Sequence, residues 1–403
     1  MWVPLPLDEI TLGEPLPVAV WDPRGQLLLA KGAAIRDELH REWLRMHTPV
    51  IRREDHDIWR KHYVAALDRA VRRNESLQTI ARIARPMQFD EPVAQPDETA
   101  RPLSERLADL HAALTLLLHQ GSHAQDFGGR FVQIDRQLGR WLHQQPDAVL
   151  LVLVQMLFNP RLGYSAAHAL TCAAVAGLTA QTLGWPAATA DALRRAALSM
   201  NLGMARLQDE LACQAEPLRP EQRQAVHAHP QRSEAILREV GVRDALWLDL
   251  VRDHHEIPGG GGYPRGAVEV SEPAQLLRLV DVYVARLSPR LHRPGLPAPR
   301  AARDVCLDAS GVPTPLGAAL VRTLGLYIPG SYVELANGEL AVVARRGARA
   351  TTPLVLAFTG RDGLPRSEPL LRDTAEAAHE VRRSVPAQEV KVRVSVERLL
   401  ARV

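Results

Sequence analysis

The sequence has few cysteines and few lysines. Cys172, Cys213 and Cys306 lie far apart among 403 residues. An odd number of scattered cysteines argues against a disulfide framework and is typical of a reducing compartment. Only three of the 49 basic residues are lysine, and we attribute the excess of arginine to a compositional bias shared with alanine, leucine and proline. The sequence therefore predicts a cytoplasmic protein without disulfides.

Long apolar runs and a strong net charge are also missing. The longest apolar segment, residues 148–158, is shorter than the roughly 20 residues that span a bilayer, and the first residues lack the basic segment of a signal peptide. The net charge is only +3, which gives no reason to expect nucleic acid or membrane insertion. With 46% hydrophobic and 24% charged residues, the composition predicts a globular protein of two or three domains.

The first hundred residues predict a small module and a linker. Two apolar runs flank a turn cluster at 22–25, which predicts a hairpin, and 35–46 has helical periodicity. Residues 55–84 are charged and lack glycine and proline, so we expect a connector helix that could support a homodimer. Residues 1–84 thus form a predicted α+β sensory or docking module, and the proline-rich segment 85–102 is a predicted linker.

The remainder of the chain changes from helix to strand. Residues 103–325 show helical periodicity without a strand pattern, which predicts an all-helical domain. Asn337-Gly338 between two apolar runs predicts a hairpin, and the segments 353–358 and 390–395 are further predicted strands. The predicted fold class is therefore mainly α, with a β-rich appendage over 326–403.

Residues with chemical potential concentrate in the segment 251–265. Two adjacent imidazoles, His254 and His255, precede Glu256 and a loop with four consecutive glycines. Imidazole is the commonest protein metal ligand, and glycine lets the backbone approach a ligand closely. Composition alone leaves two interpretations open, a metal or phosphate site and a solvated helix end followed by a surface loop.

The spacing of this segment resembles the signature of the HD-GYP family. That signature is His-His-Glu, two residues, Asp-Gly, one residue, Gly-Tyr-Pro. The loop positions that match are Glu256, Gly260, Gly262, Tyr263 and Pro264, whereas Gly259 replaces the family's aspartate. The resemblance covers about residues 150 to 330. It implies an all-helical HD-type domain of cyclic di-GMP phosphodiesterases, which hold clustered iron or manganese ions.

The resemblance also implies a set of metal ligands. The family positions that this chain keeps are His168, His229, His254, His255 and Asp281. We expect His229, His254 and His255 to face one pocket, with His168 and Asp281 nearby. His227 is expected to be a solvated neighbour. Three protein ligands with an open position can hold one ion. Two outcomes are left open. The chain binds one divalent ion, which could be iron, manganese or another metal, or it binds no metal.

Other family positions are replaced. The family's His-Asp pair lies in His-Asp-Ile-Gly-Lys, where this chain has Met200-Asn201-Leu202-Gly203-Met204, and the family's upstream glutamate is Tyr164. Two-metal chemistry needs ions about 3.5–4 Å apart, and Asn201 lacks the carboxylate that would bridge them. A thioether such as Met200 does not suit iron or manganese. The resemblance therefore implies a degenerate active site without an assigned catalytic residue.

Two functions remain open from the sequence. The first is a catalytically impaired binding or protein-interaction module in bacterial cyclic di-GMP signalling. Such a module would keep affinity for cyclic di-GMP, or dock a signalling protein on the Tyr263-Pro264 loop. The second is a metal-dependent phosphodiesterase with a reduced metal centre, acting on cyclic di-GMP or a related phosphoester, in which Arg290 holds the phosphate. The replaced His-Asp pair favours the first.

Overall fold

The structure is a computed structural model. It describes residues 2–7, 10–53, 55–57, 59, 63, 101–159, 162–308, 310–392 and 394–402. The chain forms two compact units, 1–101 and 102–403, and each is described by itself. The predicted connector helix and linker lie almost entirely outside the described residues. Among the helices that are described, none combines the length and the apolar character needed to cross a membrane.

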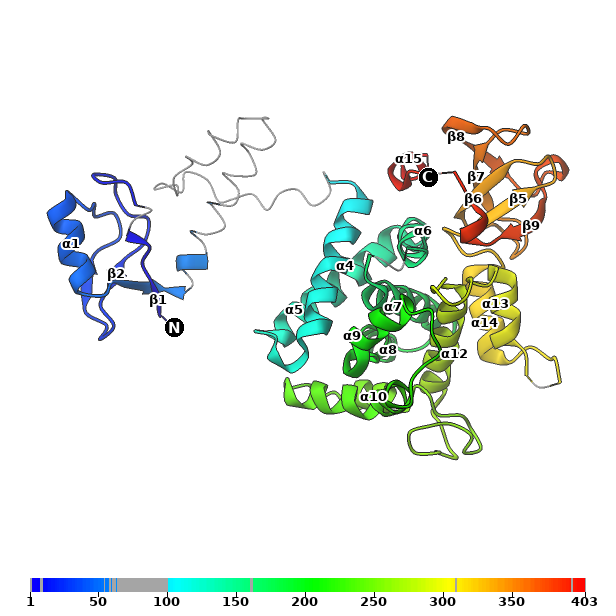
Figure 1. Ribbon diagram of the computed structural model, residues 1–403, viewed down its shortest axis with the longest axis horizontal. Helices are drawn as coiled ribbons and strands as arrows, with labels where there is room; N and C mark the ends of the chain where they lie inside the picture. Colours follow the sequence, from blue (N-terminus) through cyan, green and yellow to red (C-terminus); the bar gives the residue numbers. More distant parts are fainter. Residues whose placement is uncertain are drawn as a thin grey trace. The chain divides into compact units, whose positions relative to one another are not determined.

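The first unit is a small α+β module (Figure 1). Its sheet has the order β1-β4-β2-β3 and consists of β1 (Trp2–Pro4), β2 (Val20–Trp21), β3 (Leu27–Leu29) and β4 (Val50–Arg52). β2 and β3 are antiparallel and form the predicted hairpin, in which the Asp22 carboxylate accepts the backbone N–H of Arg24. The predicted helix is α1 (Glu38–Met46), and the Asp37 side chain caps its first turn.

The second unit begins with a helical domain. Its helices are α4 (Leu103–Gln120), α5 (Phe127–Gln144), α6 (Pro146–Leu157), α7 (Tyr164–Thr182), α8 (Ala187–Ser199), α9 (Ala205–Ala212), α10 (Pro220–Glu239), α11 (Ala245–Asp253), α12 (Glu272–Leu287), α13 (Ala298–Cys306) and α14 (Pro315–Leu324), with the 3-10 turns η2 (Gly121–His123) and η4 (Leu202–Met204). No strand occurs among the described residues of 103–325. The predicted all-helical domain is therefore confirmed.

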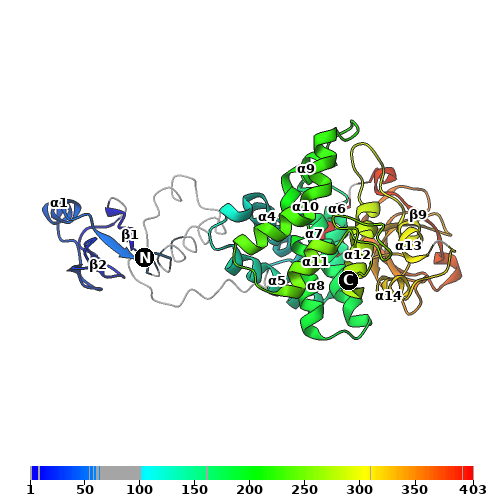
Figure 2. The same ribbon diagram turned by 90° about the horizontal axis from the view of Figure 1, so that it is seen from below.

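Helix α7 is the centre of this domain. Every residue from Tyr164 to Ala180 is buried, and a helix that is apolar on all sides belongs inside a core. Its many alanines let α6, α8 and α12 pack closely against it. Figures 1 and 2 show α4 and α5 on one side of α7 and α12 to α14 on the other. A polar side chain on α7, such as His168, is consequently held deep in the domain.

The unit ends with an antiparallel sheet in the order β8-β7-β6-β5-β9. Its strands are β5 (Tyr332–Leu335), β6 (Leu340–Arg345), β7 (Leu354–Thr359), β8 (Pro365–Asp373) and β9 (Val381–Val385). β5 and β6 form the hairpin predicted from Asn337-Gly338. One face of the sheet, with Leu356 and Phe358, joins the helical core, so the β-rich appendage is packed on the helices.

The predicted strand over 390–395 is wrong, because the residues of this segment that the structure describes form no strand. The turn η6 (Ala387–Glu389) precedes this segment, and α15 (Val396–Leu400) follows it with Ser395 as its cap. Val390, Val392 and Val394 pack against the core from an irregular segment. The alternation of valines thus reflects one-sided packing and not a strand ladder, because alternation reports burial of one face alone.

Candidate metal centre

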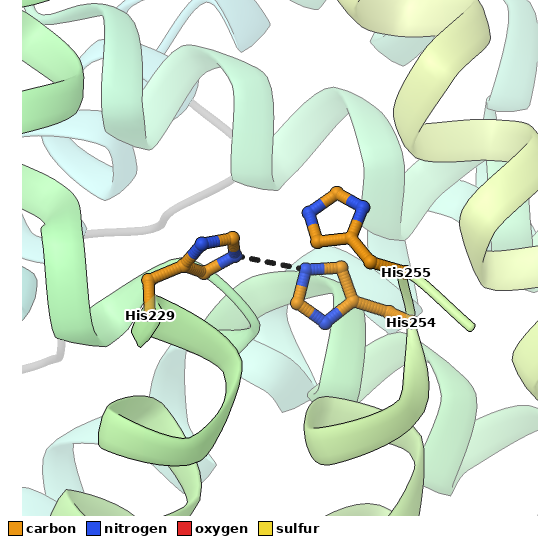
Figure 3. A group of neighbouring side chains, drawn as sticks. All are labelled: His229, His254 and His255. Atoms are coloured by element: carbon orange, nitrogen blue, oxygen red, sulfur yellow. Dashed lines mark hydrogen bonds between the residues drawn. The ribbon is translucent and has the colours of Figure 1, made fainter. Parts of the chain in front are cut away.

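Three imidazoles meet where α10 and α11 pack together (Figure 3). His229 lies within α10, whereas His254 and His255 directly follow the end of α11. Their ligand nitrogens all lie within 4.8 Å of one another. His229 and His254 are fully buried, and His255 is partly exposed. The structure therefore brings the three histidines together, as the sequence predicts.

Backbone carbonyls fix the hydrogen positions on two of these rings. His229 Nδ1 lies 2.5 Å from the carbonyl oxygen of Val226, and His254 Nδ1 lies 2.7 Å from that of Val251. A carbonyl oxygen can only accept, so each Nδ1 carries the hydrogen. The Val226 carbonyl is free for this contact because Pro230, four residues later, has no N–H to donate to it. The Pro in the His-Pro pair thereby orients the imidazole.

The opposite nitrogens of the same rings face each other. His229 Nε2 and His254 Nε2 are 3.1 Å apart (Figure 3). In a neutral ring with hydrogen on Nδ1, Nε2 is a bare acceptor. Two such lone pairs repel at this distance unless a proton or another cation lies between them.

Burial disfavours a proton between these two nitrogens. Loss of hydration, and next the neighbouring His254, lowers the pKa of His229 to about 3 and that of His255 to about 2. Burial likewise lowers the pKa of His254. All three rings are therefore neutral near neutral pH, and they present nitrogen donors of the kind that divalent metals bind.

A second group of donors lies beside the three imidazoles. His168 Nε2 is 2.8 Å from Asp281 Oδ1, and both side chains are buried. Burial raises the pKa of Asp281, but the hydrogen bond from His168 and the nearby imidazoles of His255 and His254 outweigh it and hold that pKa well below its usual range. Asp281 is thus an ionised carboxylate that interacts with both groups, and the structure places His168 and Asp281 near the three imidazoles.

Tyr164 occupies the position of the family's upstream glutamate. Its ring stacks on His168 with centroids 5.4 Å apart, and its Oη is 3.3 Å from His168 Nδ1. Arg290 Nη2 donates to the same oxygen at 3.2 Å, and its guanidinium lies 5.2 Å from the Tyr164 ring centroid. Tyr164 therefore positions both His168 and Arg290. The Nε of Arg290 is buried and has no hydrogen-bond partner within the described part of the chain.

Met200 and Asn201, at the positions expected for the family's His-Asp pair, lie in a tightly packed turn. Ser233 Oγ donates to the carbonyl oxygen of Met200 and accepts the N–H of Gly203. A Cβ at Gly203 would lie 2.9 Å from the carbonyl oxygen of His229, so only glycine lets η4 approach α10 this closely. Asn201 Oδ1 is buried and unpaired among the residues described. Contacts with α10 thus hold the backbone around Met200 and Asn201 in place.

Met204, at the position expected for the lysine of the family's His-Asp-Ile-Gly-Lys segment, faces a different cavity. It lines a cavity of about 390 Å³ between η2, α9 and α10. That cavity is also lined by His119, His123, Arg206 and Arg232 and by none of the three imidazoles.

Glu256 holds the glycine loop closed from within the protein. It is fully buried, and its two carboxylate oxygens accept the backbone N–H groups of Arg265 at 2.7 Å and Ala267 at 2.8 Å. Both oxygens of Glu256 therefore close the glycine loop on itself, and the assignment of this loop to a ligand or partner stays a prediction. Within that loop Gly259 and Gly260 have φ of +91° and +87°, values at which an aspartate side chain would be strained.

The Tyr263 ring is not freely exposed on the loop. It lies between the rings of His227 and His255, with centroid distances of 4.1 and 4.5 Å. His227 is exposed, as expected, and its ring also stacks on Tyr263. The stack joins the loop to the metal centre, and no sequence signal shows it, because His227 and Tyr263 meet only through tertiary packing.

Three comparisons with known proteins bear on this arrangement. Residues 152–310 match the family model described as HD domain. Cyclic di-GMP phosphodiesterase PA4108 of Pseudomonas aeruginosa is 32% identical over 144 residues, which are 35% of this chain and 35% of that protein. The solved structure of Bd1817, described as a HDG"Y"P protein from Bdellovibrio bacteriovorus, matches with a TM-score of 0.43 and 15% identity, over 79% of this chain and 98% of that one.

Two of these matches bear on the class of the protein. Residues 152–310 are similar to HD domains, and a stretch of 144 residues is similar to a cyclic di-GMP phosphodiesterase. The match spans about a third of the length of the curated relative.

Proposed function

We propose that this chain is a catalytically impaired HD-GYP protein of bacterial cyclic di-GMP signalling, which binds one divalent metal ion at His229, His254 and His255. The observation that carries the proposal is the 3.1 Å approach of two bare Nε2 atoms. A cation bound to both nitrogens replaces their repulsion by attraction. Protonation would do the same, but burial of the rings disfavours it.

The surroundings of the three imidazoles suit this role. Metal-binding histidines usually donate their second N–H to a carbonyl or a carboxylate, which fixes the ring. His229 and His254 do so to Val226 and Val251. Three neutral nitrogen donors leave open positions on the ion, and a bound ion supplies Lewis-acid polarisation of a phosphate oxygen. The chain's own contribution is to orient the rings through Pro230 and the Tyr263 stack.

Impaired catalysis follows from what lies beside this site. A two-metal centre needs a carboxylate that bridges the ions, and Asn201 offers only a neutral amide. Asp281, the remaining carboxylate, accepts a hydrogen bond from His168 at 2.8 Å. A single ion at three imidazoles cannot clamp both the attacking and the leaving oxygen of a phosphodiester. We therefore expect hydrolysis far slower than the 1–1000 per second common for enzymes.

Cyclic di-GMP is the proposed ligand because the curated relative is named as its phosphodiesterase. A phosphate at the metal site would also meet Arg290, whose guanidinium is held in place by Tyr164 and has an unpaired Nε among the described residues. Planar guanidinium groups suit phosphate oxygens. Binding without rapid turnover would make the protein a reader of the nucleotide, with the exposed part of the glycine loop as the surface for a signalling partner.

The test combines metal content with turnover. The full chain is purified without chelating resin, loaded with manganese or ferrous iron, and assayed for metal by elemental analysis and for cyclic di-GMP hydrolysis by chromatography. We expect about one bound ion and no hydrolysis above the metal-only background. His254→Ala should lose the ion, whereas His143→Ala, a change at an exposed position on α5, should keep it.

Rapid hydrolysis of cyclic di-GMP would contradict the proposal of impaired catalysis. Robust hydrolysis by the unmodified chain that His254→Ala abolishes would show that a mononuclear site suffices, and the protein would be a phosphodiesterase with a reduced centre. Restoring the family pair with Met200→His and Asn201→Asp should raise metal content before it raises activity, because Tyr164 and Met204 still differ from the family.

A further inference from the structure

We propose that the cavity between η2, α9 and α10 binds a small phosphorylated molecule, whose phosphate is held by Arg206 and Arg232. The cavity measures about 390 Å³, and pockets of about 300–1,000 Å³ take small organic ligands. The described residues that line it include neither the three imidazoles nor Arg290. The proposed site is therefore separate from the metal centre and does not depend on the proposed function.

The two arginines are available for an anion. Arg206 lies in the first turn of α9, and Arg232 lies on α10. A Cβ at Gly203 would lie 2.9 Å from Cβ of Arg232, so Arg232 starts beside the turn that leads into α9. Within the described part of the chain, neither guanidinium forms an ion pair with a carboxylate. Planar guanidinium forks match phosphate oxygens, and two of them on one cavity fit a phosphate group.

Hydrogen bonds fix one wall of the cavity before a ligand binds. Arg206 Nε donates to the carbonyl oxygen of His119 at 3.0 Å, which leaves its two Nη groups to face another acceptor. His119 Nε2 lies 2.6 Å from Asp209 Oδ2, and the oxygens of Asp209 also accept the N–H and the hydroxyl of Ser165 at the start of α7. Because these contacts already hold Arg206 and His119 in place, less side-chain freedom is lost when a ligand binds.

The charges around the cavity favour an anion. Among the described residues that line it, Glu210 is the only one with a carboxylate, against two arginines and the imidazoles of His119 and His123. Even when both imidazoles are neutral, the positive charges outnumber the negative one. The two arginines and Glu210 are exposed, so solvent and salt screen each charge and limit what a single contact contributes.

Apolar side chains line the rest of the cavity and determine what kind of molecule it fits. They come from α4, η4, α9 and α10 and are Leu118, Leu202, Met204, Leu207 and Ile236. A phosphate ion would leave this apolar surface in contact with water. A phosphate ester with an apolar or aromatic body would cover it, and removal of apolar surface from water is favourable. The cavity therefore fits a phosphate monoester of this kind better than a phosphate ion.

Phenyl phosphate is the probe, because it joins a phosphate to a compact aromatic ring. Its affinity for the metal-free full chain is measured by calorimetric titration and compared with that of inorganic phosphate. We expect phenyl phosphate to bind more tightly than inorganic phosphate, and Arg206→Ala and Arg232→Ala each to weaken its binding about tenfold. Arg223→Ala, a matched change at an exposed arginine of α10 that does not line the cavity, should bind like the unmodified chain.

Further variants separate the possible outcomes. Glu210→Gln removes a negative charge from the lining and should strengthen the binding of phenyl phosphate about twofold. Arg290→Ala, a change at the metal centre, should leave this affinity unchanged. If Arg206→Ala fails to fold, as circular dichroism would show, Arg232→Ala and Glu210→Gln test the same site. No binding of phenyl phosphate, or binding that Arg290→Ala weakens and Arg232→Ala does not, would overturn the cavity site and leave the proposed function standing.

Discussion

Replacing Gly262 with alanine tests whether the glycine loop holds His255 in the metal centre. A Cβ at this position would lie 2.4 Å from the backbone nitrogen of Ile257, 2.5 Å from Cα of Glu256 and 2.6 Å from the carbonyl oxygen of His255. Ordinary contacts of a Cβ begin near 3.4 Å, so the two sides of the loop would have to separate by about 1 Å.

The cost of that separation can be set from the atoms involved. All three are backbone atoms, which cannot rotate away as a side chain would. Overpacking of this kind costs about 1–3 kcal/mol. One contact is the carbonyl of His255 itself, and the next residue, Tyr263, stacks on the same imidazole. If the metal-bound arrangement carries the strain, metal affinity falls by about 5- to 150-fold, since about 1.4 kcal/mol corresponds to a factor of ten.

Gly261→Ala is the matched control, because its Cβ would meet no atom within 4 Å and its backbone is not left-handed. Manganese affinity of both variants and of the unmodified chain is measured by calorimetric titration, with circular dichroism to monitor the fold. We expect Gly261→Ala to bind like the unmodified chain and Gly262→Ala to bind more weakly. Equal affinities for the two variants would refute the view that the loop backbone positions His255.

Three further predictions concern the same region. Glu256→Gln removes one of two charged acceptors of loop N–H groups, so it should speed hydrogen exchange at Arg265 and Ala267, while Glu269→Gln, at an exposed loop position, should not. In the metal-free chain the unfolded state takes up protons below about pH 6.5 that His229, with its pKa of about 3, refuses. The free energy of unfolding should therefore fall as the pH falls from about 6.5 towards 3, by up to ~1.4 kcal/mol per pH unit for this group. Denaturant unfolding at pH 7 and pH 5 measures this change in the free energy of unfolding. The same change with pH in His229→Gln as in the unmodified chain would contradict the prediction. Arg290→Lys lacks the planar fork and should weaken cyclic di-GMP binding in a calorimetric titration; unchanged affinity would remove Arg290 from the proposed ligand site.

The fold was largely predictable because its strongest signals are local. Helical periodicity over 103–325 reports which faces are buried, and Asn337-Gly338 sets its hairpin through turn geometry alone. Strands β8 and β9 were not predicted, since both are largely exposed and show little alternation of apolar residues. The segment 390–395 shows the converse error, in which alternating valines pack on one side without pairing with a neighbouring strand.

The site was predictable only where residue identity carries the information. Family spacing pointed to His229, His254 and His255, and the structure brings them together. The hydrogen bond from His229 to the Val226 carbonyl, and its dependence on Pro230, could have been inferred from helix geometry. The ring of His227 on Tyr263 could not, because it depends on how the loop folds back.

Several polar groups around Met200 and Asn201 are paired within the protein. His168 pairs with Asp281, and Ser233 satisfies both the Met200 carbonyl and the Gly203 N–H. Met200 is an apolar side chain that needs no partner in the core. Asn201 Oδ1, like Arg290 Nε, is a buried atom without a hydrogen-bond partner among the described residues, which costs about 1–3 kcal/mol. A carboxylate there would be costlier still unless a cation stood beside it. We therefore expect position 201 to accommodate a neutral amide more readily than a carboxylate in a chain that binds no cation beside it.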